Sequence, residues 1–266
     1  MNQVQVHSLF TDFDIDLFIM CFLFFIGVLL LVILPKGGFK IVGVPITWGY
    51  LYLGFVFLIL TKKLINKGNH VLNLKHIILY LVTLPFVIYF TFHIIFKGYE
   101  GTFGSLISFY VSFMFLPLLF FIYLPPFLKR IDESYITNKI SNAVFIVSIF
   151  GIILFFIKLF FKYDFEIPFI TINSGDIGEF NTKYNGRGDL SKLISTYNNG
   201  NIFGVCILIL FPIFYSNEKV KLKIIVVIVA LILTLSRTVW LGLLFYFLLI
   251  YNKKIFSILK AGLLLS

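Results

Sequence analysis

The topology of this chain depends on one stretch, Thr234-Leu235-Ser236-Arg237-Thr238-Val239-Trp240-Leu241, which joins apolar runs at residues 223–235 and 239–251. An arginine at the centre of a bilayer costs about 2.5–3.5 kcal/mol even on the mildest scale. A helical hairpin that turns at Arg237 avoids most of that cost, so we expect two short spans with this residue just below the headgroups. One continuous helix is the alternative. It would leave Arg237 in mid-membrane and reverse the sidedness of everything that follows.

The rest of the chain has the composition of a membrane protein. Of its 266 residues, 60% are hydrophobic, 19% aromatic and 13% charged, whereas soluble domains are about 45–50% apolar. The net charge of +10 lies mainly in short loops between apolar runs, where Lys and Arg set topology, so nucleic acid is not an expected partner. Cys21 and Cys206 lie in apolar segments without metal-ligand spacing, and we expect neither a metal nor a cofactor.

The apolar runs predict the number of membrane segments. A helix needs about 20 apolar residues to cross a hydrocarbon core of ~30 Å. Five segments have that length: residues 15–34, 41–60, 77–96, 103–124 and 143–161. Three shorter runs follow, at residues 202–216, 223–235 and 239–251. We therefore predict an all-α, polytopic transmembrane helix bundle of about 8–9 membrane segments.

Three regions follow from this pattern: a five-helix membrane region (1–161), a polar outer loop (162–201) and a membrane region with the Ser-Arg-Thr hairpin (202–266). The first apolar run follows acidic residues and no basic n-region, which predicts a retained helix and not a signal peptide. A last apolar run begins at Ile255 and reaches only about half the spanning length by Ser266. The chain therefore looks C-terminally truncated. A re-entrant or interfacial helix is the alternative.

Basic residues in alternating loops predict the orientation. The short loops on one side of the membrane hold Lys36, Lys40, Lys97 and Arg237. The loops on the other side hold many more: Lys62, Lys63, Lys67, Lys75, Lys129, Arg130, Lys139, Lys219, Lys221, Lys223, Lys253 and Lys254. That richer side should be cytoplasmic. We expect a multi-pass protein with a cytoplasmic N-terminus, and both the loop at 162–201 and the Arg237 turn facing outward.

Two arginines in the predicted outer loops are candidate ligands for an anion. Arg187 and Arg237 could form a two-pronged clamp for a diphosphate, because guanidinium forks match phosphate oxygens bidentately. Ser236 adjoins the second arginine. Asn201 is the predicted N-cap of a helix that opens at Ile202. Since Asn, Ser and Gly also favour turns and caps, a purely structural role for this polar stretch stays open.

Two further polar residues lie near the outer ends of predicted spans. His93 and Lys158, in the third and fifth segments, would complete a wet outer cavity with the arginines. A lysine near a helix end commonly extends to the interface, and a histidine commonly packs with a hydrogen bond, so both have structural alternatives. His93 is the weak candidate for a catalytic base. No Gly-rich phosphate loop and no metal-binding motif occurs.

The stretch from Thr234 to Leu241 resembles the Ser-Arg-containing helix hairpin of the bacterial O-antigen ligase and O-antigen polymerase family. Upstream, Arg187 followed by Asn198 to Asn201 is similar to that family's outer-loop arginine and the Asn that opens its next helix. Gly200 stands where the family has Pro, and Ser-Arg-Thr replaces Ser-Arg-Gly. The resemblance covers about residues 187–244, and upstream it is one of hydropathy alone.

The resemblance implies polymerisation or ligation of surface polysaccharide, such as O-antigen, lipopolysaccharide or capsule repeat units. The donor would be a polyprenyl-diphosphate-linked glycan at the outer face of the cytoplasmic (inner) membrane, used without a cofactor. Arg187 and Arg237 would hold the diphosphate, with Ser236, Asn201 and Lys158 in support. Chain-length regulator or flippase proteins would be partners. The alternative class is a membrane transporter or flippase for a lipid-linked or anionic substrate, which would use the same arginines without chemistry.

Overall fold

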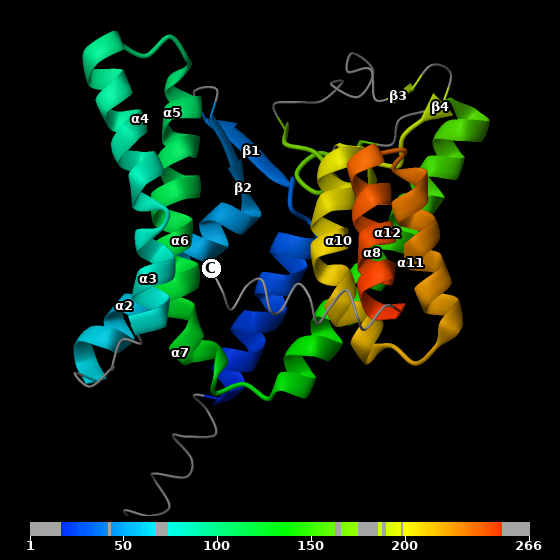
Figure 1. The fold of residues 1–266 in the computed structure, drawn as a ribbon, viewed down its shortest axis with the longest axis horizontal. Helices are drawn as coiled ribbons and strands as arrows, with labels where there is room; N and C mark the ends of the chain where they lie inside the picture. Colours follow the sequence, from blue (N-terminus) through cyan, green and yellow to red (C-terminus); the bar gives the residue numbers. More distant parts are fainter. Residues whose placement is uncertain are drawn as a thin grey trace, which may run out of the picture. The chain divides into compact units, whose positions relative to one another are not determined.

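The computed structural model describes residues 17–41, 44–67, 74–162, 166–174, 186–187, 190–197 and 199–251 (Figure 1). It divides into two compact units, the first of Met1–Leu31 and Gly38–Ile136, the second of Val32–Gly37 and Thr137–Ser266. Helices dominate the described residues, and strands form only two small hairpins, so the predicted all-α class is confirmed. The predicted segment at Ile255 lies outside the described residues.

Four described helices are long and apolar enough to cross a membrane: Leu74–Lys97, Phe103–Leu128, Glu133–Phe161 and Gly200–Asn217. Shorter apolar helices occur at Leu17–Ile33, Trp48–Lys62 and Arg237–Tyr251. A protein with several such helices belongs in a lipid bilayer, where helices satisfy their own backbone hydrogen bonds. The finer count of 8–9 membrane segments stays a prediction.

The first unit includes the helix Leu17–Ile33 as far as Leu31, and the last residues of this helix form the π-helical segment η1 (Leu29–Ile33). Strands β1 (Gly38–Ile41) and β2 (Val44–Thr47) then pair antiparallel, and α2 spans Trp48–Lys67. The prediction of a helix from residue 41 is therefore wrong. The β-branched residues around Pro45 favour extended backbone, and proline cannot donate a helical hydrogen bond.

Two helical segments complete the first unit. Helices α3 (Leu74–Leu81) and α4 (Leu84–Lys97) follow one another, and Pro85 stands in the first turn of α4. The segment Phe103–Leu128 alternates between α and π geometry: α5 (Phe103–Tyr110), η2 (Val111–Phe115), α6 (Leu116–Leu118), η3 (Leu119–Tyr123) and α7 (Leu124–Leu128). A core centred on Leu119, Met20 and Val56 joins the Phe103–Leu128 segment to the first helix and to α2.

The second unit contains the long helix α8 (Glu133–Phe161) from Thr137 onward. The described parts of the predicted loop at 162–201 contain strands β3 (Gly186–Arg187) and β4 (Leu190–Ser191) and the 3-10 turn η5 (Ser195–Tyr197). Helices α10 (Gly200–Asn217), α11 (Lys221–Leu233) and α12 (Arg237–Tyr251) follow (Figure 1). Their shared core is aromatic and aliphatic, with Phe203, Phe211, Phe214, Leu231 and Val239 fully buried.

The predicted hairpin is present. Helix α11 ends at Leu233 and α12 begins at Arg237, so the intervening Thr234–Ser236 reverses the chain. Both helices pack on α10 and on each other. The hairpin therefore brings Arg237 to a helix end, as the cost of burying its charge in hydrocarbon requires.

Candidate functional site

The Thr234–Ser236 turn fixes where Arg237 stands. Leu235 has a left-handed backbone (φ 51°). The buried Thr234 hydroxyl donates to Leu231 O at 2.6 Å and accepts from Ser236 N at 3.4 Å. Trp240 closes the first turn of α12 by donating its backbone N–H to Ser236 O at 3.0 Å. The turn is thus held by its own hydrogen bonds, and the exposed Arg237 side chain starts from a defined helix N-terminus.

The chain at residues 191–197 lies against that turn. Leu193 N donates to Leu233 O at 3.0 Å, satisfying a carbonyl at the C-terminus of α11. Ser195 donates its hydroxyl to Val147 O at 2.7 Å, and Tyr197 donates its hydroxyl to Val32 O at 2.9 Å. Burial raises the pKa of Tyr197 above its usual range, so its hydroxyl remains a neutral donor. These bonds fix the loop segment that carries Lys192.

Small residues let α10 approach the turn closely. A Cβ at Gly200 would lie 2.7 Å from Leu193 O and 3.5 Å from Thr234 O, and one at Gly204 would lie 2.4 Å from Val239 Cγ2. Glycines four residues apart on one helix face allow this kind of contact in membrane proteins. The start of α10, the Lys192 segment and the α11–α12 turn are therefore packed at backbone distance.

A pocket of about 340 Å³ forms where these three segments meet. Its described lining combines two cationic side chains with amide and hydroxyl groups and one valine: Lys192, Arg237, Asn201, Ser236, Thr238 and Val205. None of these lining residues is acidic. The N-terminus of α12 adds a partial positive charge of about +0.5. This arrangement suits an anion with several oxygen atoms, such as a phosphate or diphosphate.

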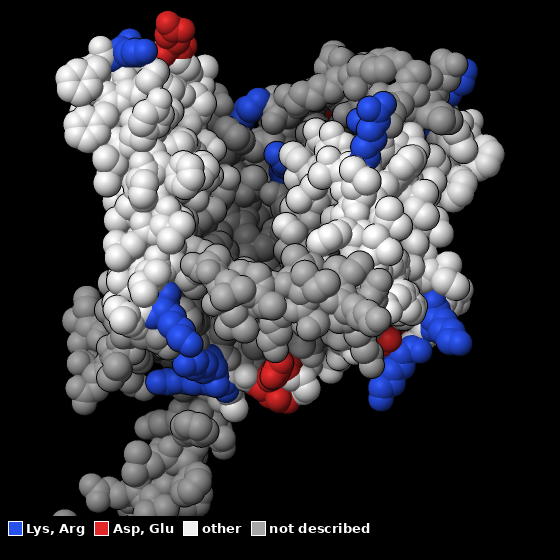
Figure 2. Space-filling model, in the orientation of Figure 1, with Lys and Arg blue, Asp and Glu red and all other residues white. Residues whose placement is uncertain are grey.

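The opposite end of the same helices is also basic. Lys219, Lys221 and Lys223 lie at the junction of α10 and α11, a helix length away from the pocket. Figure 2 shows blue side chains at both ends of this part of the second unit, with white, uncharged side chains between them. Such a distribution fits helices whose middle contacts hydrocarbon.

The predicted site residues have different outcomes. Arg237, Ser236 and Asn201 all line the pocket. Arg187 lies in β3, where its backbone pairs with Leu190, but its side chain is outside the described part of the structure. The proposed convergence of the two arginines stays a prediction. Asn198, in the motif, also lies outside the described residues.

Asn201 has a different role from the predicted one. Helix α10 begins at Gly200, and Asn199 is its N-cap, with its side-chain oxygen accepting from Asn201 N at 2.8 Å and Ile202 N at 3.5 Å. The prediction of Asn201 as the cap is therefore wrong. Because Asn199 takes the capping position, the exposed Asn201 side chain is one of the pocket's lining groups.

His93 and Lys158 do not line this pocket. His93 is exposed on α4 of the first unit, with its ring 6.4 Å from that of Tyr89. Lys158 is half-buried in the last turn of α8. The described lining residues of the pocket all belong to the second unit, and the charged ones among them are Arg237 and Lys192.

Lys192 is the pocket residue that sequence reasoning missed. It follows β4 directly and is half-buried. Its placement depends on the long-range bond from Leu193 N to Leu233 O, which no local pattern announces. The only sequence signal is its position in the same polar stretch as Arg187, nine residues before Asn201.

No family model, no curated protein and no solved structure matches this chain. Within the described residues, no group of three or more His, Cys, Asp or Glu side chains gathers to hold a metal ion. The pocket is therefore the feature of this chain that points to a function.

Proposed function

We propose that the Lys192–Arg237 pocket binds the diphosphate of a polyprenyl-linked glycan, and that the protein polymerises or ligates surface polysaccharide repeat units such as O-antigen or capsule. The observation that carries this proposal is a pocket on the turn between two apolar helices, whose described lining residues include two cations and no acidic side chain. The likeness of that turn to the hairpin of O-antigen ligases and polymerases supports the same assignment.

Glycosyl transfer explains why cations would be useful there. An acceptor hydroxyl attacks the anomeric carbon and releases its proton to solvent, the bond from that carbon to the diphosphate oxygen breaks, and negative charge grows on the leaving diphosphate. Donors held in place before the reaction stabilise such charge without reorganising. Arg237 offers a planar fork fixed by the helix start, and Lys192 offers a point charge from the anchored loop. Arg187 remains a candidate third cation.

The proposed location is the outer face of the cytoplasmic membrane. Three lysines gather at the α10–α11 junction, at the far end of α10 from the pocket. Short loops rich in Lys and Arg are usually cytoplasmic. We therefore assign the pocket to the outer side, where assembled repeat units meet their acceptor, and the N-terminus to the cytoplasm.

A flippase or transporter for a lipid-linked or anionic substrate is the second candidate. The same cations would bind the headgroup, and no attacking group would be needed. The two lining cations favour any anionic substrate. In this alternative the pocket binds the substrate, but no covalent bond is made or broken there.

One experiment separates the two. Arg237→Ala is introduced at the native gene, and both the chain length of lipid-linked glycans and the side of the membrane they occupy are measured. A transferase predicts that single repeat units accumulate on the outer face without elongation. A flippase predicts that they accumulate inside. Lys221→Ala is the matched control because it removes a cation from the other end of the same helices. Unchanged glycans in an Arg237→Ala protein present at normal levels would contradict both functions.

A further inference from the structure

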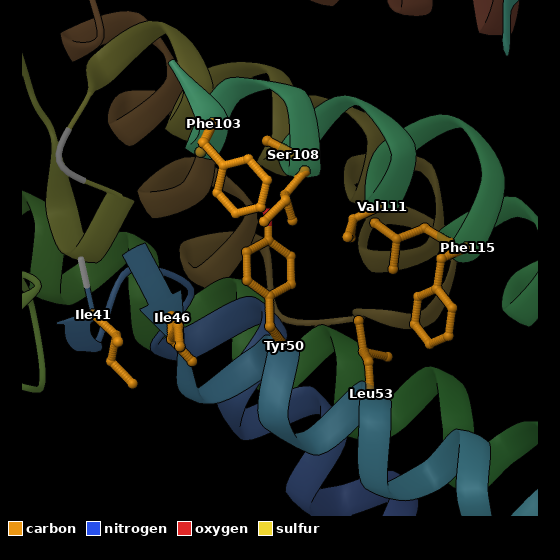
Figure 3. A pocket seen from close by; sticks show the side chains of 11 residues that line it. Ile41, Ile46, Tyr50, Leu53, Phe103, Ser108, Val111 and Phe115 are labelled. Carbon is orange, nitrogen blue, oxygen red and sulfur yellow. The ribbon is translucent and has the colours of Figure 1, made fainter. Parts of the chain in front are cut away.

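The first unit contains a larger hollow of different chemistry. It measures about 590 Å³. It lies between the β1–β2 hairpin and the start of α2 on one side, and α5, η2 and α6 on the other (Figure 3). Apolar side chains dominate its lining, among them Ile46, Leu53, Phe103, Ile107, Val111 and Phe115. Tyr50 rises from α2 across the hollow toward Phe103 and Ser108 (Figure 3). The hollow belongs entirely to the first unit and does not depend on the proposed function.

The lining excludes a charged ligand group. Among the described lining residues there is no Lys, Arg, Asp, Glu or His, and the side-chain hydrogen-bonding groups are the hydroxyls of Tyr50 and Ser108. Small-molecule sites have this balance, with apolar walls, few polar groups and volumes of about 300–1,000 Å³. The occupant should therefore be hydrocarbon, with at most one weakly polar end.

The size of the hollow distinguishes between apolar occupants. One turn of an α-helix, with a diameter of about 10–12 Å and a rise of about 5.4 Å, fills roughly 400–600 Å³. The hollow of about 590 Å³ is thus comparable in volume to a single turn of a helix. A flexible hydrocarbon chain can occupy the same space along its length and brings no backbone groups that need hydrogen-bond partners.

The wall of the hollow has unusual helix geometry. Val111 and Phe115 are the first and last residues of η2, and both line the hollow. Leu116 N bonds Val111 O across five residues, in place of the α-helical step of four. Single π-helical turns occur often at functional sites. The surrounding segment, Phe103–Leu128, is a candidate membrane span with few buried residues, so lipid is the available apolar ligand.

We propose that this hollow is a binding site for one hydrocarbon chain of a membrane lipid. The chain lies between α2 and the α5–η2 wall, with its more polar end toward Tyr50 and Ser108. Both an acyl chain and an isoprenoid chain have this chemistry.

Photo-crosslinking tests the site. The full-length protein is reconstituted in vesicles of phosphatidylethanolamine and phosphatidylglycerol that contain either a phosphatidylcholine with a diazirine on its acyl tail or a polyprenyl phosphate with a diazirine on its chain. We expect peptides covering Tyr50–Leu53 and Phe103–Leu116 to be labelled several-fold more than the exposed face of α4. Labelling by one probe alone identifies the bound lipid as acyl or isoprenoid. Labelling by both supports a site that binds a hydrocarbon chain of either type.

Filling the hollow supplies the control. Ser108→Trp places a large ring in the hollow from an exposed position and should reduce pocket labelling several-fold. Ile95→Trp, at an exposed position of α4 outside the hollow, should leave it unchanged. Ile107→Trp repeats the test if Ser108→Trp does not fold. Equal labelling of the hollow and of α4, or labelling that no filling variant reduces, would overturn the proposal, since either result describes ordinary surrounding lipid.

Discussion

The two ends of the α10–α12 bundle are both basic, but they use their charges differently. At the α10–α11 junction, Lys223 bonds Glu218 at 2.9 Å and lies 5.4 Å from the centre of the Phe145 ring. At the α11–α12 turn, Arg237 and Lys192 line a pocket in which no described lining residue is acidic. The same residue types thus contact an acidic and an aromatic side chain at one end and line a pocket at the other. Charge alone would not distinguish these roles, whereas the neighbouring groups do.

The largest expected effect is the loss of glycan transfer when the arginine of the pocket is removed. Arg237→Ala should lower the rate of glycan transfer by about 10²–10³-fold, the loss typical when a donor to a developing negative charge is removed. Arg237→Lys should restore only part of the rate, because an ammonium lacks the bidentate fork. The measurement is elongation of a polyprenyl-diphosphate glycan by reconstituted protein. Equal rates for Arg237→Ala and Lys221→Ala would remove the proposed difference between the two ends.

Lys192 provides the next largest effect. Lys192→Ala should weaken binding of polyprenyl diphosphate by about 10–100-fold, since a hydrogen bond to a charged group contributes about 1.5–3 kcal/mol. Equilibrium binding in detergent measures this, and the loss should shrink at high salt because part of it is electrostatic. Lys219→Ala is the matched control from the other end. A loss as large in this control would indicate general attraction by net charge.

A glycine substitution tests the close packing behind the pocket. Gly200→Ala should destabilise the protein by about 1–3 kcal/mol through overpacking, because its Cβ would lie 2.7 Å from the main-chain Leu193 O. Gly54→Ala is the control, since a Cβ there meets nothing within 4 Å. Unfolding in denaturant measures both variants. Similar stability for the two would mean that the loop carrying Lys192 can move away at little cost.

The smallest expected effect is a change in stability at the α10–α11 junction. The hydrogen bond from Lys223 holds the pKa of Glu218 below its usual value. A carboxyl with a lowered pKa in the folded state stabilises the protein above its unfolded pKa of about 4.3, and that contribution disappears as the pH falls through the folded value. Glu218→Gln should therefore lower the free energy of unfolding by less than about 1 kcal/mol at neutral pH.

The control for this variant is to measure the free energy of unfolding in strong acid. The difference between Glu218→Gln and the parent should vanish in strong acid, where the parent carboxyl is protonated as well. Glycan transfer should be unchanged at neutral pH. A loss of transfer in Glu218→Gln would show that the two ends of the bundle are coupled.

The hairpin at Arg237 was predictable because the cost of a mid-membrane arginine exceeds the preference of the flanking residues for one long helix. The β1–β2 hairpin was not, since a short apolar run does not distinguish a strand from a buried helix. The π-helical segments η1, η2 and η3 were not predictable either. Their geometry depends on packing between helices and leaves no mark in hydropathy.

The site was predicted in part for a related reason. Arg237 could be identified because a charge beside apolar runs is conspicuous. Lys192 could not, because its position is set by main-chain contacts to residues far along the chain. The shift of the cap from Asn201 to Asn199 has a local cause, since several adjacent asparagines offer equivalent caps and only the backbone geometry selects one.

The bond from Leu193 N to Leu233 O has an evolutionary consequence. It joins two main-chain atoms, so it makes no demand on the side chain at either position. Position 193 is therefore constrained by its buried volume and by the need for an N–H, which excludes proline and permits other apolar residues. Proteins that share this loop could have diverged widely in sequence while still presenting a cation at the position of Lys192.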